Sequence, residues 1–240
     1  MNQRPVKSAQ QLIDSLESLA NPEQALLSLR YMKSAPGDYA FGDQFLGVKM
    51  GPIRDLAKTY RNLPLSEVLL CLHSPWHEVR SCALVIWTLQ FAKATAEQQQ
   101  TIYRDYLANT DFINNWDLVD ISTPKIVGLY LLDKPRNDLY QLVKSDVLWQ
   151  RRIAVLACFP MIRNGESTDI LKLCEVLLED KEDLIHKACG WMLRELAKRN
   201  QAIVEQFLQD HYSQINRTQL RYAIERFEPE LRQRYLKGQF

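Results

Sequence analysis

The sequence lacks any apolar run long enough to cross a lipid bilayer. Its longest runs, such as the Ala-Leu-Val-Ile-Trp of residues 83–87, are far shorter than the roughly 20 residues that a membrane-spanning helix needs. Residues 1–5 are polar and lack the apolar core of a secretory signal peptide. We therefore expect a soluble, cytoplasmic protein.

Net charge is nearly absent as well. The 240 residues carry a formal charge of +1 at pH 7, so bulk charge gives no reason to expect a nucleic-acid partner. A basic surface would have to arise from the arrangement of the cations. Charged residues make up 25% of the chain and hydrophobic residues 46%, which is ordinary for a folded protein and argues against extended disorder.

Cysteine is scarce, and its spacing does not indicate metal binding. The five cysteines include no CxxC pair, and their odd number favours reduced thiols in the core over a disulfide framework. They are Cys71, Cys82, Cys158, Cys174 and Cys189. His73 and His77 are four residues apart, but the Ser-Pro of residues 74–75 lies between them and no further ligand is suitably spaced. We expect no metal site and a structural or exposed role for both histidines.

Motifs of the common enzyme classes are also missing. The sequence has no glycine-rich phosphate loop between a strand and a helix, no Ser/His/Asp order and no zinc-ligand pattern. Interpretations as a classical hydrolase, kinase or dehydrogenase therefore lose their support.

Strand-like alternation is absent, and apolar residues recur at helical spacing instead. Residues 8–20 form one amphipathic segment, and Asn21 and Pro22 then supply an N-cap and a first-turn proline for a second helix over residues 23–33. Residues 34–51 are the one long irregular segment and hold four of the eight glycines. The aromatic residues of this loop indicate that part of it packs against the fold, although a flexible linker is the alternative.

A repeated pattern organises the rest of the chain. Four helical segments begin with two polar or bulky residues followed by small or apolar ones, and the last three starts, at positions 151, 186 and 221, are 35 residues apart. The first start, at position 80, lies about two periods earlier, and the midpoint falls on Trp116. Each of these helices follows another helix, which is typical of solenoid repeats, and the absence of a TPR consensus favours HEAT-like repeats. We predict an all-α fold: a right-handed α-solenoid of HEAT-like two-helix repeats, forming a single domain over residues 1–240 with a concave, basic groove.

Trp116 and Asp120 are the first candidate site. They are four residues apart in a helix, so the indole and the carboxylate would share one face, where they could meet a cation. A buried tryptophan beside an exposed, helix-stabilising aspartate is the alternative. In the solenoid, equivalent helices line one concave surface, which would bring this pair towards Trp191. The neighbouring Gly190 indicates close approach of a ligand or of another helix there.

Cations on the same surface could bind phosphate groups. Each of them could equally belong to a solvated helix face. They are Arg152, Lys187, Arg194, Lys198, Arg217 and Arg221. We expect the remaining tryptophans to be core or scaffold residues, and these are Trp76, Trp87 and Trp149.

Several segments match one known family in the same order along the chain. They are residues 31–33 (Tyr-Met-Lys), 45–48 (Phe-Leu-Gly-Val) with Pro52 and Arg54, 116–120 (Trp-Asp-Leu-Val-Asp), 149–152 (Trp-Gln-Arg-Arg) with Ala154 and Leu156, and 187–198 (Lys-Ala-Cys-Gly-Trp-Met-Leu-Arg-Glu-Leu-Ala-Lys). Together with the repeat, they make the chain resemble bacterial DNA alkylation repair proteins of the AlkD type, which are HEAT-like-repeat alkylpurine DNA glycosylases. The match runs from Tyr31 to about Arg226. It departs at Asn115, where the family has an aromatic residue, and in the longer connection over residues 34–51.

The resemblance implies an activity and a partner. The protein would excise cationic N3- or N7-alkylated purines from double-stranded DNA by hydrolysing the N-glycosidic bond, without flipping the base into a pocket. It would need no metal, nucleotide or redox cofactor, and we expect a monomer. The implied catalytic residues are Trp116, Asp120 and Trp191. The expected DNA-binding residues are Tyr31, Arg152 and Arg194 by resemblance, with Lys187 and Arg221 from the repeat alone.

Two other functions stay open at this point. A relative of the same fold without glycosylase activity would bind distorted or branched DNA. A solenoid scaffold for proteins would instead be expected to present an acidic or apolar concave face.

Overall fold

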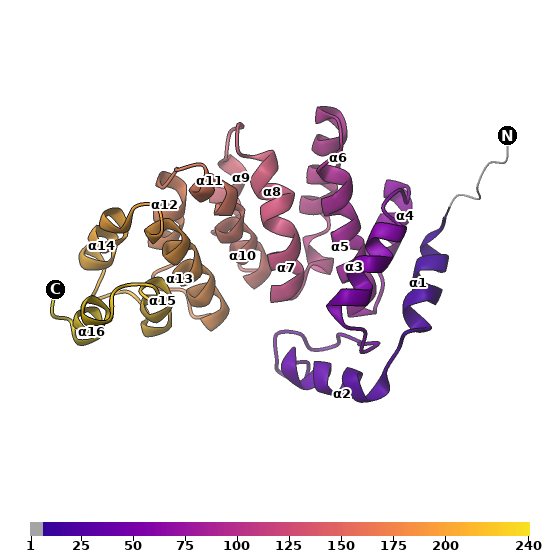
Figure 1. Cartoon of the computed structure of the whole chain (residues 1–240), viewed down its shortest axis with the longest axis horizontal. Helices are drawn as coiled ribbons and strands as arrows, with labels where there is room; N and C mark the ends of the chain where they lie inside the picture. The colour runs from indigo at the N-terminus through magenta and orange to yellow at the C-terminus, as the bar shows by residue number, and fades with distance from the viewer. Residues whose placement is uncertain (1–6) are drawn as a thin grey trace. The chain divides into compact units, whose positions relative to one another are not determined.

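The computed structural model describes residues 7–240, and the regular structure of this range is helical (Figure 1). An isolated β-bridge joins Gln44 to Trp76, and no strand occurs between residues 7 and 240, which confirms the predicted all-α class. None of these helices is long and apolar enough to pass through a membrane. The α-helices are α1 (Ala9–Glu17), α2 (Pro22–Tyr31), α3 (Met50–Thr59), α4 (Leu65–Leu72), α5 (His77–Phe91), α6 (Ala96–Ala108), α7 (Trp116–Ser122), α8 (Val127–Tyr130), α9 (Asn137–Leu142), α10 (Leu148–Ala157), α11 (Phe159–Arg163), α12 (Thr168–Val176), α13 (Asp183–Ala197), α14 (Gln201–Asp210), α15 (Arg217–Ala223) and α16 (Pro229–Lys237). Two short 3₁₀ helices, η1 (Thr110–Phe112) and η2 (Thr123–Lys125), flank α7.

The chain forms two compact units, Met1–Ile126 and Val127–Phe240. The second helix of each predicted repeat begins near its expected position, at residues 77 and 116 in the first unit and at 148, 183 and 217 in the second. At least one helix precedes each of them, but two helices lie between α7 and α10 and two between α10 and α13, so the HEAT-like two-helix repeat stays a prediction. The arrangement of residues 1–240 as one right-handed solenoid domain stays a prediction.

The first two helices begin within one residue of the predicted starts. Ser8 caps α1 in a capping box with Gln11, and Asn21 caps α2 by accepting a hydrogen bond from the N–H of Gln24 at 3.0 Å. Pro22 occupies the first helical position, where its missing N–H costs nothing. The two helices end at residues 17 and 31, earlier than the sequence pattern predicted.

α5 is the centre of the first unit. Twelve of its fifteen residues are buried, and it packs against α3, α4, α6 and α7. Trp87 is fully buried, which confirms its role in the core. This largely buried helix provides a fixed wall against which α7 is positioned.

α13 has the same central position in the second unit, where it packs against α10, α12, α14 and α15. Its contact with α15 depends on Gly190. A Cβ atom at this position would lie 2.5 Å from the Cβ of Tyr222 and 2.6 Å from the carbonyl oxygen of Gln219. Close packing of two helices therefore accounts for this glycine, and approach of a ligand is not needed.

All five cysteines are free and buried, as the sequence predicted. Burial raises the pKa of the Cys71 and Cys82 thiols to about 12. They are therefore unreactive thiols of the core at neutral pH.

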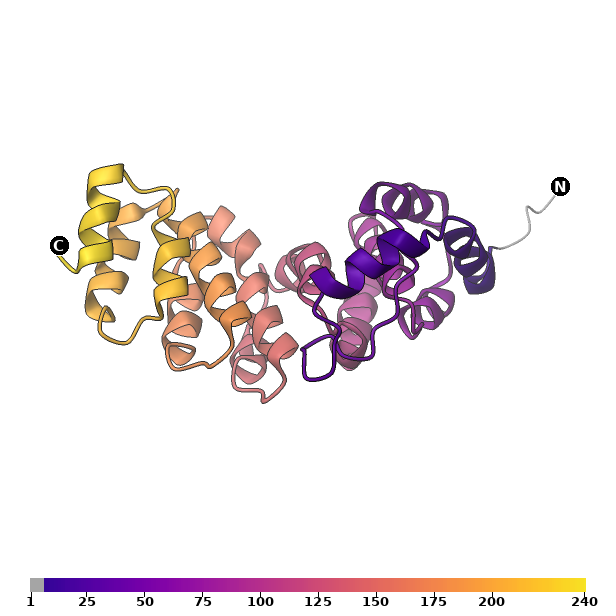
Figure 2. The same ribbon diagram turned by 90° about the horizontal axis from the view of Figure 1, so that it is seen from below.

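Residues 32–49 connect α2 to α3 and pack back against the first unit. Figure 2 shows the segment leaving the end of α2 and returning along it, and the N–H of Asn21 donates to the carbonyl oxygen of Leu46 at 2.8 Å. Gly47 has a φ of 78° and lies so close to the start of α2 that a Cβ would collide with its backbone, so a glycine is required. The flexible-linker alternative is therefore wrong. The loop begins and ends two residues earlier than predicted, since α2 ends at residue 31 and residues 50–51 belong to α3.

Candidate functional site

α7 carries two of the predicted site residues. Asn115 is fully buried and caps the helix, because its side-chain oxygen accepts a hydrogen bond from the backbone N–H of Trp116 at 2.8 Å. Trp116 is the first residue of the helix and Asp120 the fifth, so helical geometry puts both side chains on one side. Both residues are half-buried. The alternative of a buried tryptophan beside an exposed aspartate does not describe this pair.

Tyr31 lies against Trp116. It is the last residue of α2 and 69% exposed, and its ring meets the indole edge to face, with centroids 5.9 Å apart and planes at 76°. This geometry is favourable because the positive edge of one ring meets the negative face of the other. The first unit thus brings together two predicted residues that are far apart in the sequence.

Asp120 lines an open cavity of about 380 Å³ in the first unit. Three cations share the lining: Arg54 and Lys58 from α3 and Lys125 from η2. The wall between them is largely apolar and consists of Val85, Leu89 and Ile121, with Thr88. This open cavity therefore combines one half-buried carboxylate with three cations.

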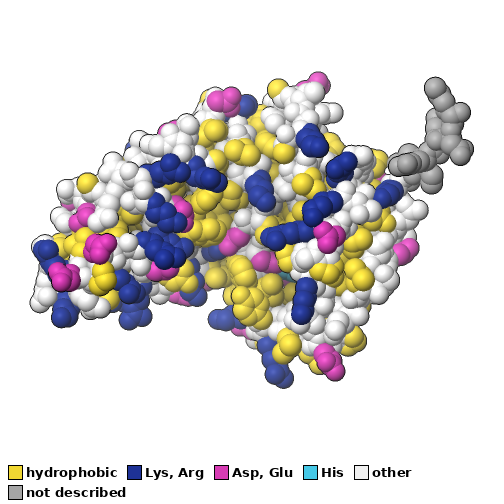
Figure 3. Space-filling model, in the orientation of Figure 1, with side chains coloured by type: hydrophobic (Ala, Val, Ile, Leu, Met, Phe, Trp, Pro, Cys, Tyr) yellow, Lys and Arg dark blue, Asp and Glu magenta, His cyan; other side chains and the backbone are white. Residues whose placement is uncertain are grey.

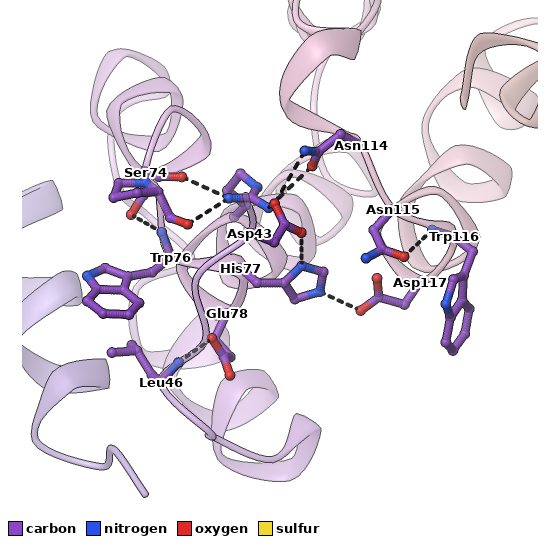
Figure 4. A network of polar contacts seen from close by, with 12 residues as sticks. Asp43, Leu46, Ser74, Trp76, His77, Glu78, Asn114, Asn115, Trp116 and Asp117 are labelled. Carbon is purple, nitrogen blue, oxygen red and sulfur yellow. Dashed lines mark hydrogen bonds and ion pairs between the residues drawn. The ribbon is translucent and has the colours of Figure 1, made fainter. Parts of the chain in front are cut away.

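A polar network lies at the start of α7 (Figure 4). The Nε2 atom of His77 is 2.8 Å from a carboxylate oxygen of Asp117, and its Nδ1 atom is 3.2 Å from Asp43. Arg80 donates to the other oxygen of Asp43 at 2.7 Å. His77 is 3% exposed and Arg80 is 4% exposed, so these charges are balanced inside the protein.

The carboxylates determine the charge of His77. Burial by itself would lower the pKa of His77, but the hydrogen bonds to Asp117 and Asp43 raise it to about 9. Burial opposes ionisation of Asp43, yet His77 and Arg80 hold the pKa of that carboxyl below its usual value. At neutral pH the ring is an imidazolium with both nitrogens donating. It has no lone pair for a metal, and residues 7–240 contain no group of three or more His, Cys, Asp or Glu arranged to hold one.

Glu78, the neighbour of His77 in the first turn of α5, binds the long loop of residues 32–49. Its carboxylate accepts backbone N–H bonds from Leu46 at 2.9 Å, from Gly47 at 2.8 Å and from Val48 at 3.3 Å. The loop is therefore tied to the first turn of α5, and the neighbouring His77 ties that turn to α7. The sequence predicted a structural or exposed role for His77 but did not identify its partners, which lie 34 and 40 residues away.

Trp191 and Arg152 belong to the second unit. Trp191 is half-buried, and its ring lies 6.3 Å from that of Phe159, tilted by 52°. Arg152 is 4% exposed and donates through Nη1 to the carbonyl oxygen of Leu184 at 2.6 Å. Arg152 therefore also joins α10 to α13, a structural role that its sequence position did not reveal.

The other predicted cations of the second unit differ in their surroundings. Lys187 pairs with Asp183 at 2.8 Å, and Arg194 pairs with Glu225 on the turn after α15. Arg221 is exposed. Phosphate binding by Lys187 or Arg194 would require the phosphate to compete with a carboxylate of the protein.

Comparisons with known proteins agree with this fold. A family model described as "DNA alkylation repair enzyme" matches residues 12–227. A solved structure described as a predicted DNA alkylation repair enzyme from Enterococcus faecalis is similar, with a TM-score of 0.68 and 18% sequence identity. The similarity covers 88% of this chain and 97% of that chain, and at this identity it bears on the fold alone. No curated protein matches the chain significantly.

Proposed function

Because the chain belongs to the family of DNA alkylation repair enzymes and so has a role in the repair of alkylated DNA, we propose that it is a DNA glycosylase. It excises cationic N3- or N7-alkylated purines from duplex DNA and does not extrude the base. The observation that carries the proposal is the placement of Asp120. The half-buried carboxylate of Asp120 lines an open, cation-rich cavity. On α7, Asp120 lies on the same side of the helix as Trp116, whose ring packs against that of Tyr31.

Cleavage of the N-glycosidic bond needs little assistance from the protein, because the alkylated purine is already charged. Alkylation gives the purine a positive charge, so it leaves without being protonated. As the bond between C1′ and the purine nitrogen breaks, its electron pair neutralises the purine and the sugar gains oxocarbenium character. The carboxylate of Asp120 stabilises that positive charge and orients a water molecule, whose oxygen bonds to C1′ while its proton is released.

Aromatic rings would hold the substrate. We assign Trp116 and Tyr31, whose rings pack edge to face on each other, to contacts with the deoxyribose and the cationic base, and we assign Trp191 of the second unit to the same role. C–H···π and cation–π contacts of this kind contribute roughly 0.5–2 kcal/mol each. They would favour a cationic purine over its neutral counterpart, which is the required selectivity.

Phosphate contacts would hold the DNA strand. We assign them to four cations of the second unit, and these are Arg152, Lys187, Arg194 and Arg221. Arg152 donates to the carbonyl oxygen of Leu184, so its assigned phosphate contact would add to its role of joining α10 to α13.

The test is the release of free base from duplex DNA that carries either an N7-methylated guanine or a neutral modified purine. We expect the wild-type protein to release the cationic base and leave an abasic site, with much slower release of the neutral base. Tight binding to nicked or branched DNA without release of either base would favour a non-catalytic DNA-binding protein and overturn the proposal.

A further inference from the structure

A second open cavity, of about 510 Å³, adjoins the one that contains Asp120 in the first unit. The two cavities share Lys58 and Leu89 as lining residues. The second is formed by the end of α3, the turn that follows it, and the facing ends of α5 and α6, and it includes Arg61 and Lys93. A continuous hollow surface therefore leads away from Asp120.

Cations dominate the lining of this surface, which we call the basic track. Its exposed cations are Arg54, Lys58, Arg61, Lys93 and Lys125. The residues lining the two cavities include a single carboxylate, that of Asp120. In Figure 3, Lys and Arg side chains gather over α3 and α5. An ordinary solvated helix face interleaves charges of both signs, so the composition of this surface needs another explanation.

The cations of the basic track are available to a ligand. Lys58 pairs with Asp55 at 2.9 Å, but both side chains are at least 66% exposed, and a pair of this kind contributes only about 0–1 kcal/mol. The other four cations form no ion pair with any residue in the range 7–240. A phosphate can therefore bind them without breaking a buried interaction.

The spacing of the cations indicates a polymer of charges. Arg54 and Lys58 are one helical turn apart on the same face of α3, and Arg61 follows about one turn further, beyond the end of the helix. Arg54 and Lys58 are thus roughly 6 Å apart along the helix axis. A row of several cations can meet successive phosphates of one strand, so it suits a phosphate backbone better than a single anion.

We propose that the basic track binds the phosphate backbone of duplex DNA on one side of the lesion, so that the strand attached to the damaged nucleotide runs from Asp120 past Lys58 to Arg61 and Lys93. This inference rests on the proposed function, which places the damaged nucleotide at Asp120. It adds a phosphate-binding surface in the first unit to the contacts assigned to the second.

The test uses the double variant Arg61→Gln/Lys93→Gln, whose two positions line only the cavity without Asp120. Binding to an unmodified duplex is measured by fluorescence anisotropy over a range of salt concentrations. We expect the slope of log K against log salt to become shallower by about 1.8, since each lost phosphate contact changes it by about 0.9. The matched control is Arg104→Gln/Lys172→Gln, with exposed cations on α6 and α12 that line neither cavity, and it should keep the wild-type slope.

The rate of base excision in a single turnover, measured at saturating protein, separates the basic-track proposal from the glycosylase proposal. If the wild-type protein excises the base and the double variant keeps the wild-type salt slope, the basic track is wrong and the glycosylase proposal stands. If the slope falls as expected but neither protein excises, the basic track is supported and the glycosylase proposal fails. Circular dichroism melting of both double variants confirms that they are folded.

Discussion

His77 balances two carboxylates that reach it from separate parts of the first unit. Asp43 comes from the long loop and Asp117 from the first turn of α7, so a single ring joins both segments to α5. Removing one partner of a buried charge pair is costly because the other charge remains uncompensated. We infer that this histidine holds α7, and hence Trp116 and Asp120, in place.

The stability of the protein should therefore depend on the protonation of His77. The folded pKa of about 9 lies above the ordinary value of 6.5, so the protonated ring stabilises the fold fully below pH 6.5, and this contribution is lost as the pH rises towards 9. The shift corresponds to about 3 kcal/mol. Urea unfolding at pH 6.5 and at pH 9 measures this loss. We expect the free energy of unfolding of the wild-type protein to fall between the two pH values. That of His77→Gln should be lower at pH 6.5 and should fall less. His73→Gln, at an exposed histidine, should behave as the wild type. A His77→Gln protein with the wild-type pH dependence would contradict this role.

Single residues were predictable where the reason lies in the local sequence. The Asn21 cap, the core position of Trp87 and the buried cysteines follow from neighbours and from periodicity. The partners of His77 lie 34 and 40 residues away in sequence, and nothing in the spacing pairs them before the helices are packed. The structural hydrogen bond of Arg152 to α13 was missed for the same reason.

At the scale of elements, two helix contacts position the site residues. α7 is held by the Asn115 cap and by the network around His77, and α13, which carries Trp191, is held against α15 at Gly190. The repeat period predicted roughly where five of the helices begin, and these are α5, α7, α10, α13 and α15. It could not show that the long loop is fastened to Glu78, because that contact depends on backbone N–H groups and not on side-chain pattern.

Gly190→Ala should destabilise the second unit. The added methyl would meet Tyr222 and the backbone of Gln219, and such overpacking costs about 1–3 kcal/mol. Gly51→Ala is the matched control: it is also helical, and a Cβ there has no neighbouring atom within 4 Å, so this change should be neutral or slightly stabilising. Chemical denaturation measures both. Equal stability of the two variants would show that α13 and α15 can separate without cost.

At the scale of the whole molecule, the charge is balanced but its distribution is not. The chain has 30 Lys and Arg against 29 Asp and Glu, yet one carboxylate accompanies five cations along the basic track. From the near-zero net charge, composition could predict only that any basic surface must arise from the placement of the Lys and Arg side chains. Its position could not be predicted, because the cations come from α3 and the turn after it, from the turn after α5 and from η2, which meet only in the folded first unit.

The most direct measurement is the single-turnover rate at which Asp120→Asn releases a methylated purine from alkylated duplex DNA. The substitution keeps the shape of the side chain and removes the charge that faces the developing oxocarbenium ion. We predict that excision falls by about 100-fold or more while the affinity for DNA stays near the wild-type value. Asp111→Asn, at an exposed carboxylate in η1, should leave the rate unchanged. Equal excision by Asp120→Asn and the wild type would contradict the assignment of Asp120 as the catalytic carboxylate.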